Sequence, residues 1–173
     1  MNQQPLQSAL QRAEHIFSKR PEAAQMHTIA RASVRDGTRC EFSEDQWRLV
    51  ADMPEPIGGT ASGPTPSTLA RAALSTCLAI GYSMRAAYLG VPIRGVEVEL
   101  RAQVDIRGLF CGQAEVPNYG ALAYLVIFDS DAPASELQRV LDEADERSPD
   151  LQLFKTAQSL SREMRVLPTA AVA

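Results

Sequence analysis

Three cysteines and two histidines are the residues of this chain best suited to nucleophilic or metal chemistry. The cysteines, Cys40, Cys77 and Cys111, stand far apart in the sequence, and no two of them form a CxxC pair. The histidines, His15 and His27, have no sequence neighbours suited to a metal site or a Cys–His pair. We therefore expect neither a metal nor a bound cofactor. Because the number of thiols is odd, a disulfide framework is also a poor expectation.

Cys77 lies within a predicted long helix. Thr65-Pro66 is typical of a helix start, and the pattern continues to about Leu89, where Gly90 and Pro92 end it. From Leu69 to Ile80 the helix is apolar nearly all round, which predicts a central, buried element. A cysteine there can be simply a packing residue, since free cysteine is among the most buried residue types. The pattern alone leaves open whether Cys77 packs or reacts.

The other elements predict an α+β fold. A first helix, carrying Leu6 to Phe17 at helical spacing, ends at Pro21. Strands are expected over Thr28–Val34, Thr38–Phe42, Trp47–Ala51, residues 96–106 and Ala121–Phe128, with a hairpin turn at Asp36-Gly37. Helices are expected to start at residues 131–133 and at Ser148-Pro149, followed by a last strand over Leu160–Leu167. This order lacks the regular alternation of a doubly wound sheet.

Size and charge favour one acidic globular domain. The chain has 173 residues, 45% of them hydrophobic, and a formal net charge of −4, which argues against a nucleic-acid partner. The longest apolar run, Ala121–Phe128, is too short to span a bilayer. The N-terminus has neither the basic start nor the apolar core of a signal peptide. We expect a cytoplasmic protein with reduced thiols and no membrane partner.

The run from Gly58 to Cys77 resembles the hallmark of the OsmC/Ohr family. It contains a GG turn (Gly58-Gly59), a G-x-x-P helix start (Gly63 to Pro66) and a leucine- and alanine-rich segment that ends at the cysteine. The segments at residues 104–108, 129–132 and 144–149 resemble later parts of the same family. This resemblance implies an OsmC-like fold over residues 26–168: antiparallel-rich sheets around a long central buried helix, in an intertwined homodimer. Residues 1–25 would then be an N-terminal helical extension and 169–173 a tail.

The resemblance also implies redox chemistry. Better-studied members reduce organic hydroperoxides in a peroxiredoxin-like manner with two cysteines per site. The cysteine matched by Cys77 attacks the peroxide, and a second cysteine, followed by proline, resolves the product as a disulfide. Here Ser148 precedes Pro149, so an external small or protein thiol would have to act as reductant. Cys40 or Cys111 could replace the missing thiol only if it lay close to Cys77.

Two charged residues are matched to the activating groups of the family. Arg35, just before Asp36-Gly37, falls where the peroxidase branch has an arginine that favours the thiolate. That branch places a glutamate two residues before its GG, where this chain has Pro56, so Glu55 is the neighbouring candidate to orient Arg35. The expected catalytic residues are therefore Cys77, Arg35 and Glu55.

Two other classes of function stay open. The chain could be a non-catalytic dimer that binds an apolar small molecule in an inherited pocket. It could also be a structural or regulatory homodimer in which Cys77 is inert. Fast alkylation of the thiol in the folded protein distinguishes the enzyme from inert packing.

Overall fold

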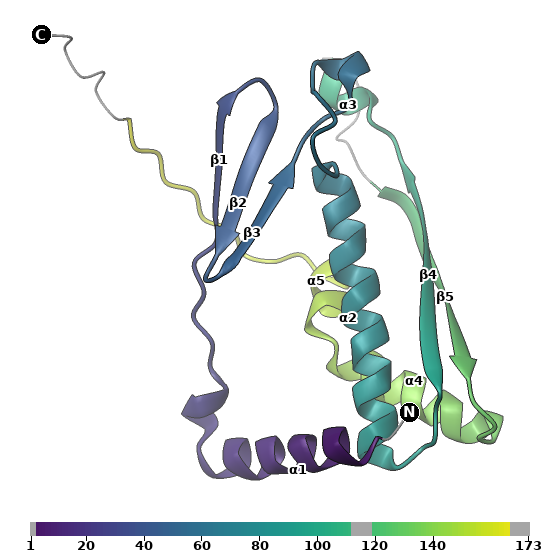
Figure 1. The fold of residues 1–173 in the computed structure, drawn as a ribbon. Coiled ribbons are helices and arrows are strands. Elements are labelled where there is room, and N and C mark those ends of the chain that lie inside the picture. The colour runs from purple at the N-terminus through teal and green to yellow at the C-terminus, as the bar shows by residue number, and fades with distance from the viewer. Residues whose placement is uncertain (1–2, 112–118, 167–173) are drawn as a thin grey trace, which may run out of the picture.

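The computed structural model describes residues 3–111 and 119–166 and has the expected α+β architecture with antiparallel sheets (Figure 1). Its main helices are α1 (Gln4–Lys19), α2 (Pro66–Leu89), α3 (Arg107–Phe110), α4 (Ala134–Arg147) and α5 (Pro149–Lys155), and short 3₁₀ turns cover Pro21–Ala24 and Glu55–Ile57. Its strands are β1 (Arg31–Asp36), β2 (Arg39–Glu44), β3 (Trp47–Ala51), β4 (Gly95–Val104) and β5 (Tyr119–Asp129). The expected tail at 169–173 lies outside the described residues.

The sheet β1–β2–β3 is an antiparallel meander. Gly37 has a φ of +53° in the turn between β1 and β2, which confirms the hairpin expected at Asp36-Gly37, because glycine adopts this left-handed conformation without a steric penalty. In Figure 1 this sheet stands to one side of α2, while β4 and β5 run along α2.

Asp52 fastens the loop between β3 and α2. Its buried carboxylate accepts hydrogen bonds from the hydroxyl groups of Thr38, Thr60 and Ser62, at 2.7, 2.7 and 2.9 Å. The backbone N–H groups of Met53, Thr60 and Ser62 also donate to it, at 2.8, 3.0 and 3.1 Å. These donors, those of Thr60 and Thr38 foremost, hold the pKa of Asp52 well below its ordinary value. One carboxylate therefore ties the loop to the β1–β2 turn.

The two adjacent glycines of this loop are needed for different reasons. Gly58 has a φ of +87°, in the left-handed region that favours glycine. A Cβ atom on Gly59 would lie 1.7 Å from the carbonyl oxygen of Met53, so no larger residue fits there. The GG turn is thus a steric requirement of the path that leads into α2.

Helix α2 has the limits that its sequence predicts. The hydroxyl of Thr65 accepts from the backbone N–H of Thr68 at 3.2 Å, and Pro66 follows at the first helical position. At the other end Gly90 takes the left-handed conformation with a φ of +70°.

The core lies between α2, the β4–β5 sheet and the two helices α4 and α5. Its fully buried side chains from α2 include Leu74, Leu78 and Tyr82, and they pack against Val140 of α4 and Leu151 of α5. The inward face of β4 and β5 covers the same cluster with Val96, Val98, Leu100, Tyr124, Val126 and Phe128. Burial of these apolar side chains is the main stabilising term for this half of the molecule.

Within a single chain, the central helix α2 is buried along one face only. Its buried residues lie on the Leu74–Leu78–Tyr82 side, whereas Ile80 and Met84, near Cys77, are 60% and 39% exposed. The sheet and helices of one chain cover one face of the helix only, because an α-helix presents its side chains around a full circle.

The expected last strand over Leu160–Leu167 is also corrected. Residues 157–166 form neither a helix nor a strand, and Leu160, Met164 and Val166 are strongly exposed; Leu167 lies outside the described residues. Alternating apolar residues predict a strand only where a neighbouring strand supplies hydrogen bonds, and no described strand does so here. In addition, the short helix α3 follows β4 in a segment for which the sequence predicted no element.

Asp52 generates a prediction about acid stability. The pKa of Asp52 is lowered in the folded state. Its contribution to the stability of the fold is therefore present above the ordinary aspartate pKa of about 3.9 and is lost as the pH falls below that value. Asp52→Asn should lower the thermal midpoint at pH 7 and weaken the acid-induced fall of that midpoint. Asp45→Asn, at an exposed turn residue, is the matched control. Equal midpoints and equal acid profiles for the two variants, measured by circular dichroism, would contradict this role.

Candidate functional site

Cys77 lies halfway along α2 and lines a cavity of about 360 Å³. Helix α2 contributes one wall, α1 a second, and the junction of α4 and α5 a third. The lining side chains are mostly apolar: Leu10, Cys77, Leu78, Ile80, Gly81, Tyr82, Met84, Arg85, Tyr88, Ala144, Arg147, Ser148 and Pro149. This volume is in the range of small-molecule sites, so the thiol faces a space that an apolar ligand can fill.

Ser148 is the polar group in contact with Cys77. Its Oγ lies 3.6 Å from Cys77 Sγ, although 71 positions separate the two residues. The same hydroxyl accepts from the backbone N–H of Leu151 at 3.2 Å and so caps α5. The sequence predicted the cap, and the structure adds that the capping side chain also meets the thiol.

A shared carboxylate ties the end of α4, just before Ser148, to α2 and β5. Asp145, three residues earlier on α4, accepts from the hydroxyl of Tyr82 on α2 at 2.6 Å and from that of Tyr124 on β5 at 2.7 Å. Burial, and then the hydrogen bond to Asp145, raise the pKa of Tyr124 to about 12, and the pKa of Tyr82 is raised by the same causes. Both tyrosines therefore remain donors to Asp145 at neutral pH.

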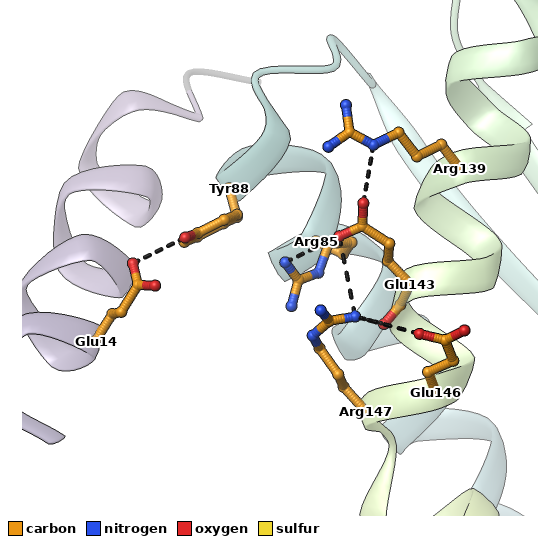
Figure 2. A network of polar contacts seen from close by, with 7 residues as sticks. All are labelled: Glu14, Arg85, Tyr88, Arg139, Glu143, Glu146 and Arg147. Carbon is orange, nitrogen blue, oxygen red and sulfur yellow. Dashed lines mark hydrogen bonds and ion pairs between the residues drawn. The ribbon is translucent and has the colours of Figure 1, made fainter. Parts of the chain in front are cut away.

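Two arginines, Arg85 and Arg147, line the Cys77 cavity and meet a shared acid (Figure 2). Arg85 contacts Glu143 Oε2 at 3.4 Å, and Arg147 contacts the same atom at 3.9 Å. Arg139 pairs with the other oxygen at 2.8 Å and is the main cause of the lowered pKa of Glu143. Arg147 also contacts Glu146 at 3.7 Å, so three arginines share two acids in this cluster.

Arg35 and Glu55 are not brought to Cys77 within one chain. Arg35, on β1, lines a different cavity of about 520 Å³, together with Asp52, Gly59 and Thr60. Glu55 lies in the exposed 3₁₀ turn of the GG loop. The structure thus places both residues around the hairpin and loop, as expected, but away from the thiol cavity.

The other two cysteines are also separate from Cys77. Cys40 lies on β2, opposite Val34 and Ala51, and Cys111 follows α3 as an exposed residue. Each cysteine is a free thiol. Within residues 3–111 and 119–166, no group of histidine, cysteine and acidic residues could hold a metal ion, and no helix is long and apolar enough to cross a membrane.

Among the lining residues that the sequence analysis did not place at the thiol are Arg85, Arg147 and Leu10. Arg85 lies eight positions after Cys77, and that spacing puts both on the same helical stripe. Arg147 directly precedes Ser148, so its position at the cavity could be inferred once Ser148 is known to lie at the thiol. Leu10 had no such signal, because nothing in the sequence indicates which face of α2 receives α1.

A model of the OsmC-like protein family matches residues 59–161, which is more than half of the chain. The chain therefore belongs to the OsmC-like family, as the Gly58–Cys77 resemblance indicated. The match includes Cys77 and Ser148 but leaves out α1, Arg35 and Glu55. A comparison with curated protein sequences gives no match.

Solved structures of several bacterial proteins share the fold. An OsmC-like protein of Mycoplasma pneumoniae has 14% identity and a TM-score of 0.65, over 76% of this chain and 89% of its own. The organic hydroperoxide resistance protein OsmC of Legionella pneumophila has 17% identity and a TM-score of 0.57, over 75% and 90%. An OsmC-like hydroperoxide resistance protein of Jannaschia sp. CCS1 has 18% identity and a TM-score of 0.53, over 82% of this chain and 93% of its own.

The contact between Ser148 and Cys77 generates a prediction in two parts. Ser148→Ala removes the cap of α5 and should cost about 1 kcal/mol in the free energy of unfolding, measured with urea. Ser148→Cys should form a disulfide with Cys77 on mild oxidation, because the two side chains already point at each other. Peptide mapping identifies the bridge, and Cys77→Ser in the same background is the control. If the introduced thiol and Cys77 both stay free after oxidation, the geometry is contradicted.

Proposed function

We propose that the protein reduces organic hydroperoxides, with Cys77 as the attacking nucleophile. The observation that carries the proposal is a free thiol on the wall of a mostly apolar cavity of ligand size. Membership of the OsmC-like family supports it, as do the relatives from Legionella pneumophila and Jannaschia sp. that are named hydroperoxide resistance proteins.

The reaction begins with the Cys77 thiolate. Its sulfur attacks the terminal oxygen of the hydroperoxide, the S–O bond forms, and the O–O bond breaks. The alkoxide leaves with the electron pair of that bond and takes a proton to become an alcohol, while the cysteine becomes a sulfenic acid. Cysteine has an ordinary pKa of about 8.5, so a positive group near the sulfur favours the reactive form.

The sulfenic acid requires an external thiol. Ser148 lies in contact with Cys77 but cannot form a disulfide. A first small or protein thiol condenses with the sulfenic acid and releases water, and a second thiol exchanges with that mixed disulfide to restore Cys77. The proton that leaves with this water comes from the attacking thiol, and the Ser148 hydroxyl can donate a hydrogen bond to the sulfenic oxygen during this step.

Arg35 and Glu55 complete the proposed site from a second copy of the chain. Within one chain Arg35 and Cys77 line different cavities, so Arg35 can reach a thiol only across a dimer. The exposed side chains Ile80 and Met84 near Cys77, and Val34 beside Arg35, offer apolar surface for such a homodimer. In that arrangement Arg35 stabilises the thiolate and Glu55 orients Arg35.

Peroxide treatment tests the proposed chemistry. One equivalent of cumene hydroperoxide should convert Cys77 in the folded protein to a sulfenic acid, trapped with dimedone and located by mass spectrometry. Arg35→Ala should slow this step by about tenfold or more, since an opposite charge shifts thiol ionisation by a unit or more. Cys77 left unmodified under excess peroxide would reject the peroxidase, and an Arg35→Ala variant as fast as the parent would reject the role of Arg35.

A mixing experiment assigns Arg35 to one chain or the other. Arg35→Ala protein and Cys77→Ser protein are each impaired, but refolding them together would create mixed dimers with one intact site. Recovery of sulfenic acid formation is expected if Arg35 acts across the dimer. No recovery, or sedimentation as a monomer at micromolar concentration, would contradict this arrangement.

A non-catalytic binding role is the second candidate, and the same cavity favours it. An apolar ligand could occupy the space without reacting with Cys77. In that case a long-chain alcohol would protect Cys77 from alkylation while peroxide left the thiol unchanged.

A further inference from the structure

Helix α1 is part of the Cys77 cavity, although the matched family residues begin only at Gly59. Leu10, near the middle of α1, lines this cavity together with Cys77. The extension is therefore a wall of the thiol site.

The cavity follows one stripe of α2 away from the thiol. Cys77, Gly81, Met84 and Tyr88 line it, and the eleven steps along the helix from Cys77 to Tyr88 cover about 16 Å at 1.5 Å per step. Helix α1 lies across this far end of α2 (Figure 1). Two residues of α1 that flank Leu10 meet this end: Glu14 accepts from Tyr88, and a Cβ on Gly90 would lie 3.9 Å from the side chain of Gln7. Leu10, between them on the same helix, therefore lines the cavity toward the end away from the sulfur.

A hydrogen bond between Tyr88 and Glu14 joins α1 to the end of α2. The hydroxyl of Tyr88 donates to Glu14 Oε2 at 2.8 Å, and this bond is the main cause of the raised pKa of Tyr88. The guanidinium of Arg85 lies 4.9 Å from the centre of the Tyr88 ring. Figure 2 shows Glu14 and Tyr88 meeting from the two helices beside the arginine cluster. No residue of α1 within Gln4–Lys19 is buried, so the helix can be altered without disturbing the core.

We propose that Leu10 is a specificity-determining residue: its side chain limits the length of the alkyl group that can lie along α2 while its reactive end meets Cys77. The identity of the substrate in this inference rests on the proposed function, whereas the position of Leu10 in the cavity does not. A short alkyl group stops before Leu10, whereas a long linear one reaches it. Hydrophobic pockets discriminate about tenfold or more for a single methylene group.

Alkylation of Cys77 tests the geometry without peroxide. N-methylmaleimide and N-hexylmaleimide both add to the thiol, and only the long reagent should extend toward Leu10. In a Cys40→Ser/Cys111→Ser background, Leu10→Ala should raise the long-to-short rate ratio at least about fivefold, and Leu10→Trp should lower it by a similar factor. Ile16→Ala and Ile16→Trp are the controls, because Ile16 is an exposed residue of α1 outside this cavity. Circular dichroism confirms that each variant is folded.

The peroxide arm separates this inference from the proposed function. The same variants are treated with tert-butyl hydroperoxide and with a linear octyl hydroperoxide, and the ratio of their oxidation rates should follow the maleimide ratio. If the maleimide ratios shift but peroxide does not oxidise Cys77, Leu10 limits ligand length as proposed and the peroxidase function is rejected. Leu10 variants whose maleimide ratios equal those of the Ile16 controls would overturn the inference, whatever peroxide does.

Discussion

The half-buried carboxylate of Asp145 joins three elements on which the rest of the site depends. Asp145 belongs to α4, and its carboxylate accepts hydrogen bonds from the hydroxyl of Tyr82 on α2 and from that of Tyr124 on β5. Hydrogen bonds to a charged acceptor are worth more than neutral ones, particularly in a part-buried setting. Asp145 lies one turn before Ser148, so these bonds fix the end of α4 from which Ser148 meets Cys77. The thiol site is therefore a consequence of how the core is tied together.

Helix α2 performs two tasks with two apolar faces. The face with Leu74, Leu78 and Tyr82 makes the core, and the face with Cys77, Ile80 and Met84 borders the cavity. A helix with a single apolar stripe would have left the thiol among polar side chains in water. The second apolar face instead lets the sulfur react, in the proposed function, next to the alkyl part of a hydroperoxide. The same surplus of apolar surface is what a second copy of the chain would cover.

Features coded by local chemistry could be predicted from the sequence, and features created by long-range packing could not. Thr65, Gly90 and Ser148 each mark a helix end through their own conformational preference, and all three helix limits are confirmed. The GG turn is likewise a local requirement of the backbone, and together with Cys77 it carried the family resemblance. By contrast, the position of Leu10 depends on where α1 docks, and the Leu160–Leu167 strand would have needed a partner strand that the pattern cannot name. Arg35 lay at the predicted turn, but a turn does not say which thiol it faces.

The proposed function requires Cys77 to prefer peroxides that carry an apolar group, because its sulfur lies on the wall of a mostly apolar cavity. The most direct measurement is a comparison of second-order rate constants for oxidation of Cys77 by cumene hydroperoxide and by hydrogen peroxide in the same folded protein. Cumene hydroperoxide is expected to react clearly faster, since only its apolar group gains from burial in the cavity. Hydrogen peroxide reacting as fast or faster would contradict it.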